Sequence, residues 1–179
     1  MDRCSRKSEV AVVAQRHTHP EVDEIRELPL LLTREIPEKW QDQNGHVNVS
    51  FYMDIYNDSG WPLLDLIGVD QRYFSDRKLG LVDLDNHIRY ISELHVGDRV
   101  SVYGQFFSCD AKRVHGAIFV VNDGKDLLAS TIEFLSLSID LEKRRSTEIP
   151  ADIAVQLHDR IRAQRQLDWT ASPCMSLAR

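Results

Sequence analysis

The residues of this chain whose types and spacing could support chemistry stand close together in WQDQNGHVNVSFY, residues 40–52. Asp42 and His46 are four positions apart, Gly45 lies between them, and Asn48 follows two positions later. A carboxylate or an imidazole can act as a general base, and a carboxylate can also attack a carbonyl carbon. By themselves, however, the same residues could form only a turn and a helix cap, because Asp, Asn and Gly are common in turns. The secondary structure expected around these residues is needed to choose between a catalytic and a purely structural role.

An amphipathic helix is expected to follow this polar stretch. Its apolar side chains recur at spacings of three, four and seven, the pattern of one helix face. They are Val49, Tyr52, Met53, Tyr56, Leu63, Leu64 and Ile67. Asn48 is the expected N-cap and Gly68 the expected end of the helix. Gly60 and Pro62 predict a kink or a break into two pieces.

Strand-like segments dominate the rest of the chain. A short apolar run at 28–36 is expected to form a first strand. Four longer runs follow the helix and are joined by short separators. They are 78–94, 98–110, 112–123 and 126–140. We expect an antiparallel meander of these strands and a closing helix at 150–167. A helix that faces one antiparallel sheet is an α+β arrangement.

Composition restricts the class of protein. A chain of 179 residues, of which 42% are hydrophobic and 28% charged, suits one soluble, folded domain. The net charge of −6 argues against non-specific nucleic-acid binding. No apolar run approaches the roughly 20 residues of a membrane span, and no secretory signal is recognisable. The three scattered cysteines form no CxxC pair and indicate a reducing compartment. We therefore expect a cytoplasmic protein without a membrane or nucleic-acid partner.

The domain organisation expected from these patterns is simple. One domain spans residues 26–167 and a tail covers 168–179. Residues 1–25 show no clean period, so we expect a poorly ordered extension or a strand loosely added to a sheet edge.

With the elements in place, the polar stretch resembles the signature of hotdog-fold thioesterases of the 4-hydroxybenzoyl-CoA thioesterase type. That family carries an Asp, two residues, then Gly, commonly followed by His, an apolar residue and Asn at the start of the central helix. The matching residues here are Asp42, Gly45, His46, Val47 and Asn48. The later YISELHVGDRVSV is similar to the family's stretch before its second long strand. The resemblance covers roughly residues 30–142. Thioesterases of carnitine and betaine degradation look closest, because they also carry motifs similar to SELHVGD and DAKRVH.

The resemblance implies a fold, an assembly and a reaction. One long sheet wraps the helix, and two sheets join edge to edge into a homodimer, or a dimer of dimers, with the active site at the interface. The implied substrate is a short or polar acyl-CoA, betainyl-CoA being one candidate. No metal or cofactor is implied, since CoA is part of the substrate. Asp42 matches the catalytic carboxylate, which acts as nucleophile or as general base. Gly45 would let the backbone approach the thioester, and an N–H near Val49 would bind its carbonyl oxygen.

Other candidate site residues keep alternative roles. His46 could act chemically or hydrogen-bond within the turn, and Asn48 could cap the helix or contact substrate. An aromatic group could accept a trimethylammonium acyl group by cation–π attraction or simply pack in the core; it consists of Trp40, Phe51, Tyr52 and Trp61.

Basic residues near the predicted strand ends are candidates for binding the CoA phosphates. Lys112 and Arg113 lie at a predicted hairpin, and Lys143, Arg144 and Arg145 follow the last strand. Family members often bind the nucleotide with basic side chains in such places, and Arg suits phosphate because it binds bidentately. The alternative is a solvated surface cluster.

Two other functions compete with hydrolysis. A hotdog enoyl-CoA hydratase or dehydratase usually places five steps between its Asp and His, whereas Asp42 and His46 are four apart. A non-catalytic acyl-CoA-binding dimer would not need Asp42.

Overall fold

The computed structural model describes residues 19–167 and residue 169. Most of the predicted extension and tail therefore lies outside the described residues. The first elements are α1 (Val22–Ile25), β1 (Leu30–Glu35), the 3-10 helix η1 (Glu38–Trp40), α2 (Ser50–Asp65) and α3 (Gln71–Arg77). They are followed by β2 (Leu79–Tyr90), β3 (Arg99–Cys109), β4 (Arg113–Asn122), β5 (Leu127–Asp140), β6 (Arg145–Ser146) and α4 (Ala151–Gln164). Residues 22–25, which the sequence placed in the extension, form a helical turn with Ile25 buried.

The strands form one antiparallel sheet in the order β1-β3-β4-β5-β2, and the short β6 pairs with β5. The β3–β4 and β4–β5 neighbours agree with the predicted meander, but β2 pairs with β5 instead of β3, so that part of the prediction is wrong. The segment between β2 and β3 therefore does not form a hairpin. Its backbone is hydrogen-bonded to other segments: Leu94 O accepts from Val47 N and Gly97 N donates to Ile36 O, both at 2.9 Å.

The central helix α2 is one continuous element that includes Pro62, so the predicted break into two pieces is wrong. Packing explains this outcome, since Ile55 and Leu63, on either side of the interruption, are buried in the core. The helix begins at Ser50 with Val49 at the N-cap position, so the predicted N-cap, Asn48, lies one residue too early. Beyond its last turn Gly68 adopts a left-handed φ of +77°, as the predicted end requires.

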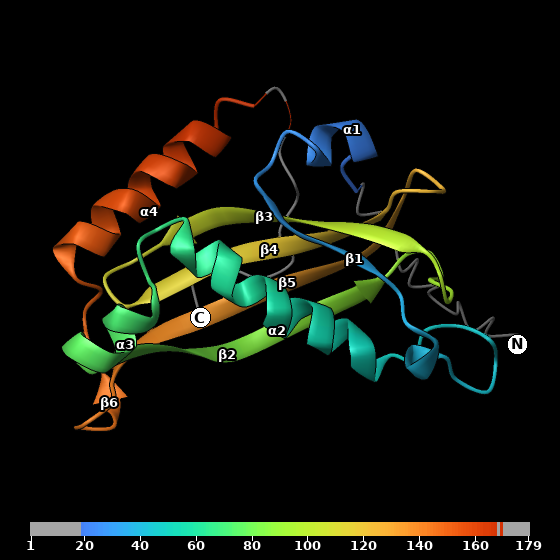
Figure 1. Cartoon of the computed structure of the whole chain (residues 1–179). Helices are drawn as coiled ribbons and strands as arrows, with labels where there is room; N and C mark the ends of the chain where they lie inside the picture. The colour runs from blue at the N-terminus through green and yellow to red at the C-terminus, as the bar shows by residue number, and fades with distance from the viewer. Residues whose placement is uncertain (1–18, 168, 170–179) are drawn as a thin grey trace, which may run out of the picture.

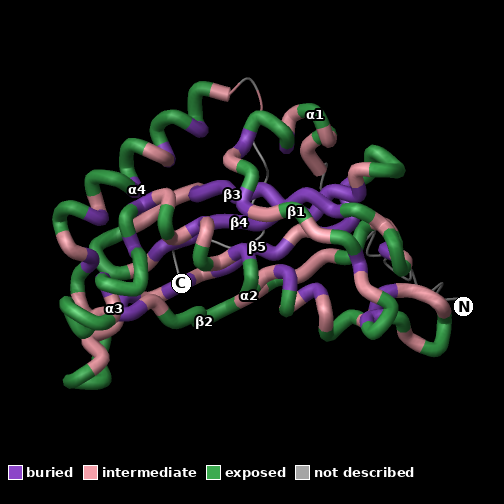
Figure 2. The backbone as a smooth tube through the Cα atoms, viewed as in Figure 1, coloured by how far each residue is buried: buried purple, intermediate pink, exposed green. Residues whose placement is uncertain are grey.

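The sheet curls around α2, and α4 lies beside this helix across β3 (Figure 1). Figure 2 shows that burial concentrates along β3, β4 and β5, while much of β2 is exposed. Ile153, Leu157 and Ile161 of α4 share the core cluster with α2, as their spacing predicted. Gln164 also bonds the β3 backbone, accepting from Phe106 N at 3.0 Å. The predicted α+β hotdog arrangement is confirmed. In the described residues, no helix is long and apolar enough to cross a membrane.

Gly116 of β4 is a position where the fold tolerates no side chain. A Cβ there would lie 2.5 Å from the carbonyl oxygen of Gln105 and 2.6 Å from Cζ of Phe134. Because backbone cannot yield easily, we expect Gly116→Ala to destabilise the fold by about 1–3 kcal/mol or more, the typical cost of overpacking. Urea unfolding would measure this loss. Gly60→Ala is the control, since nothing lies within 4 Å of its Cβ, and it should be neutral or stabilising. Equal stability of the two variants would contradict the prediction.

Candidate active site

Asp42 lies in a tight loop that its own atoms hold together. Its Oδ1 accepts from Asn44 N at 2.7 Å and from His46 N at 3.3 Å, and its N–H donates to His46 O at 2.8 Å. Gly45 completes the turn with a left-handed φ of +86°. The pKa of Asp42 is lowered, chiefly by the hydrogen bond from the Asn44 N–H. Its carboxylate is therefore ionised at neutral pH, the state that a general base or nucleophile needs.

The start of α2 offers a hydrogen-bond donor beside this carboxylate. Asn48 accepts with its Oδ1 from Ser50 N at 3.0 Å and from Ser50 Oγ at 2.8 Å, and its own N–H donates to Trp40 O. The N–H of Val49 donates to no residue in the described part of the chain. The positive end of the helix dipole lies at the same place. Asn48 thus supports the helix start, and Val49 keeps an N–H available for a ligand.

Asp42 and Val49 line one hollow of about 240 Å³. The other lining residues are His46, Val47, Tyr52, Tyr90, Ile91, Ser92 and Glu93. The last four, at the end of β2 and just after it, were not among the predicted site residues. Their stretch had been recognised as similar to the family, but nothing in the linear sequence places it beside Asp42. The Val47–Leu94 backbone bond brings the two segments together.

His46 contacts the segment after β2 instead of Asp42. Its Nε2 lies 3.2 Å from Oε2 of Glu93, and its ring packs edge-on against His95 with centroids 5.2 Å apart. These three side chains could offer a metal ion ligand atoms within 4.8 Å of one another. Lys125 Nζ, however, lies 3.1 Å from Nδ1 of His95 and adds a competing positive charge. We interpret the cluster as support for the Asp42 loop.

The predicted aromatic residues occupy different places. Tyr52 is 4% exposed, lines the hollow and packs edge-on against Tyr90 at 5.0 Å. Burial raises the pKa of Tyr52, so its phenol stays protonated. Trp40 is also 4% exposed, but it stacks on Phe51 at 5.1 Å and does not line this hollow.

The predicted basic residues lie at the other end of the sheet. Arg113 pairs with Asp110 at 2.7 Å, and Lys143 pairs with Asp140 at 3.0 Å. Lys112 belongs to the same hairpin as Arg113, Arg144 lies in the turn after β5 and Arg145 begins β6. The register pairs Asp140 with Leu79 at the start of β2, whereas Tyr90 at its end lines the hollow. At about 3.3 Å per residue, the two ends of β2 are roughly 35 Å apart. One chain does not bring these cations to Asp42 (Figure 1).

Comparison with known proteins shows which family the chain belongs to. The sequence profile of the Thioesterase-like superfamily matches residues 36–157, which include the hollow and every strand of the sheet except β1. This chain belongs to the thioesterase-like superfamily. Relatives narrow its position within this superfamily. A betainyl-CoA thioesterase from Pseudomonas aeruginosa is 28% identical over 77% of this chain and 88% of its own length. An L-carnitine dehydrogenase/betainyl-CoA thioesterase from Ruegeria pomeroyi is 33% identical over 70% of this chain. This thioesterase-like chain spans only 26% of the length of that relative and 28% of a similarly named protein from Rhizobium meliloti.

Solved structures agree with the superfamily's fold. A hypothetical protein from Staphylococcus aureus, solved in complex with CoA, superposes with a TM-score of 0.74 at 24% identity, covering 84% of this chain and 96% of that one. A putative thioesterase from Pseudomonas putida gives a TM-score of 0.67 at 27% identity, covering 85% and 94%.

Proposed function

We propose that this member of the thioesterase-like superfamily hydrolyses a short or polar acyl-CoA to a free acid and CoA. The observation that carries the proposal is the pairing of an ionised carboxylate, Asp42, with an available N–H, that of Val49, in one hollow. These are the two groups that thioester hydrolysis needs: one to activate or deliver the nucleophile, and one to stabilise the oxyanion.

The reaction that this geometry supports proceeds through attack on the thioester carbonyl carbon. The carbonyl oxygen accepts from the Val49 N–H, where the helix dipole also favours the negative charge that develops. In one route Asp42 removes a proton from water, the resulting hydroxide forms the new C–O bond, and the C–S bond breaks. In the other route the carboxylate itself attacks, and water then cleaves the mixed anhydride. In both routes CoA leaves as a thiolate and takes up a proton.

A second copy of the chain would complete the site. The edge strand β2 has 12 residues, and its exposed apolar side chains include Val82, Leu84 and Tyr90. A long exposed edge of this kind is a template for strand pairing. When two β2 strands pair antiparallel, the start of each lies beside the end of the other. Such a homodimer would bring the partner subunit's Arg145 toward this chain's Asp42 hollow, and with it the basic cluster that could bind the CoA phosphates.

Betainyl-CoA is the first substrate to test, because relatives that carry this name match 70% to 83% of this chain. We expect purified protein to release free thiol from betainyl-CoA faster than from acetyl-CoA or palmitoyl-CoA, as measured with a thiol-detecting reagent. A panel of short, branched, aromatic and polar acyl-CoAs should accompany it. Binding of acyl-CoA without thiol release from any of them would overturn the proposal, whereas loss of an enoyl-CoA's conjugated absorbance would indicate a hydratase.

A further inference from the structure

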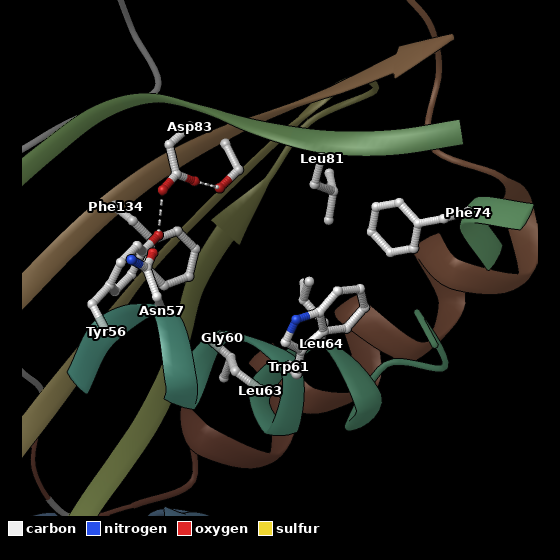
Figure 3. A pocket seen from close by; sticks show the side chains of 11 residues that line it. Tyr56, Asn57, Gly60, Trp61, Leu63, Leu64, Phe74, Leu81, Asp83 and Phe134 are labelled. Carbon is white, nitrogen blue, oxygen red and sulfur yellow. Dashed lines mark hydrogen bonds between the residues drawn. The ribbon is translucent and has the colours of Figure 1, made fainter. Parts of the chain in front are cut away.

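A second hollow, of about 300 Å³, lies between the middle of α2 and the strands β2 and β5 (Figure 3). Its character comes from four aromatic rings, one carboxylate and one hydroxyl. They are Tyr56, Trp61, Phe74, Phe134, Asp83 and Ser136. No function described above uses this hollow. The combination of aromatic faces with an anion in one cavity indicates a cationic ligand.

The carboxylate of Asp83 is held in a fixed orientation. Tyr56 donates its hydroxyl to Oδ2 at 2.6 Å, Ser136 donates to Oδ1 at 2.7 Å, and Asn86 Nδ2 lies 3.1 Å from Oδ2. Burial and the neighbouring carboxylate raise the pKa of Tyr56, so its phenol remains a donor. No lysine, arginine or histidine of residues 19–167 forms an ion pair with Asp83. Its hydrogen bonds are supplied, but within the described part of the chain its negative charge has no cationic partner.

The aromatic rings form two pairs: Tyr56 and Phe134 lie beside Asp83, and Trp61 and Phe74 lie on the other side of the hollow (Figure 3). Trp61 packs edge-on against Phe74 with centroids 5.2 Å apart, and Tyr56 lies tilted against Phe134 at 6.2 Å. The Trp61 side chain is 50% exposed, so part of its ring remains accessible to a ligand. A trimethylammonium group fits these surroundings. It has no N–H to donate and therefore needs no further acceptor, only a nearby negative charge and aromatic faces.

The hollow also lies where an acyl group would extend. Tyr52 of the Asp42 hollow and Tyr56 are one turn apart on α2, about 6 Å along the helix. Asp83 stands on the exposed edge strand β2, seven residues before Tyr90. In the proposed antiparallel pairing of β2 strands, the middle of β2 lies near the two-fold axis, so Asp83 and this hollow lie close to the subunit interface. An acyl group that extends from the Asp42 hollow would therefore reach this hollow along α2.

We propose that this hollow is the acyl-group subsite and that Asp83 selects acyl-CoAs whose acyl end carries a quaternary ammonium. The inference rests on the proposed thioesterase function. It assigns to Asp83 a specificity role that is separate from the chemistry at Asp42. The aromatic residues of this hollow also differ from those that the sequence suggested for binding the acyl group. Of that set only Trp61 lines this hollow, while Trp40 and Phe51 stack on each other elsewhere.

The test compares substrates that differ in charge but not in shape. Betainyl-CoA is matched by tert-butylacetyl-CoA, in which carbon replaces the nitrogen, and γ-trimethylaminobutyryl-CoA is matched by its all-carbon counterpart. We expect the wild-type protein to prefer the cationic member of at least one pair by about tenfold or more in kcat/KM. Asp83→Asn keeps the side-chain shape and removes the charge. It should lower kcat/KM for the cationic substrate by about tenfold and leave the neutral one unchanged.

Asp65→Asn is the matched control. It removes the same charge from the exposed last residue of α2, which lines neither hollow. It should keep the wild-type preference. Equal rates for cationic and neutral partners, or an Asp83→Asn variant with unchanged preference, would overturn the inference while leaving thiol release intact. Absence of thiol release from every substrate would instead count against the proposed function itself.

Discussion

Asp42→Asn should lower kcat for acyl-CoA hydrolysis by roughly 100- to 10,000-fold, the range typical of losing a positioned general base. Asparagine keeps a side-chain oxygen that can accept from the N–H groups of Asn44 and His46, so the loop should retain its shape. An amide, however, neither takes up a proton at neutral pH nor attacks a thioester. Thiol release at saturating substrate measures kcat, and thermal unfolding of the same preparation reports whether the fold survives.

Asp65→Asn provides the comparison for this experiment. Asp65 is exposed, is the last residue of α2 and lines neither hollow. Its replacement removes one carboxylate from the helix that Asp42 precedes, and turnover should stay at the wild-type level. If Asp42→Asn turned over at a near-normal rate, another group would have to activate the nucleophile, and the proposed role of Asp42 beside the Val49 N–H would be wrong.

Leu84→Lys is expected to convert the proposed dimer into monomers and to remove most of the activity. Leu84 lies in the middle of β2 and is 53% exposed. In a two-fold pairing, a residue near the axis meets its own copy, so each new lysine would face another. Like charges juxtaposed in an interface cost several kcal/mol, which raises the dimer Kd roughly 100-fold or more. Sedimentation at several concentrations gives the Kd, and thiol release gives the activity.

A lysine placed elsewhere separates this effect from a general change of surface charge. Val155→Lys alters an equally exposed position on α4 and should leave both mass and activity unchanged. The interface proposal fails if the wild-type protein is an active monomer at micromolar concentration. It fails as well if Leu84→Lys remains a fully active dimer.

Local patterns predicted the Asp42 segment well. Its hydrogen bonds join residues two to four positions apart, so neighbouring residues alone determine the turn that carries Asp42. The helical period located α2, although Pro62 suggested a break that core packing overrides. The loop glycine Gly45 has the left-handed φ that favours glycine.

Contacts between distant segments were harder to predict. Glu93 and Tyr90 join the Asp42 hollow only because the chain crosses the end of the sheet after β2. The basic residue Arg145 had looked like a neighbour of the site, yet the strand register places it at the opposite end of β2. Strand spacing in the sequence does not reveal which edge a strand will join.

The sequence by itself determined the central and closing helices, the long strands, the α+β class and the turn that carries Asp42, because periodicity and turn chemistry act over a few residues. The tertiary structure decided that β2 pairs with β5, leaving an exposed edge for a second copy. It also decided that Asp83, distant in sequence from Phe134 and Ser136, shares a hollow with them. Such pairings depend on how whole faces are buried and on which backbone groups are already bonded, and no local pattern encodes either.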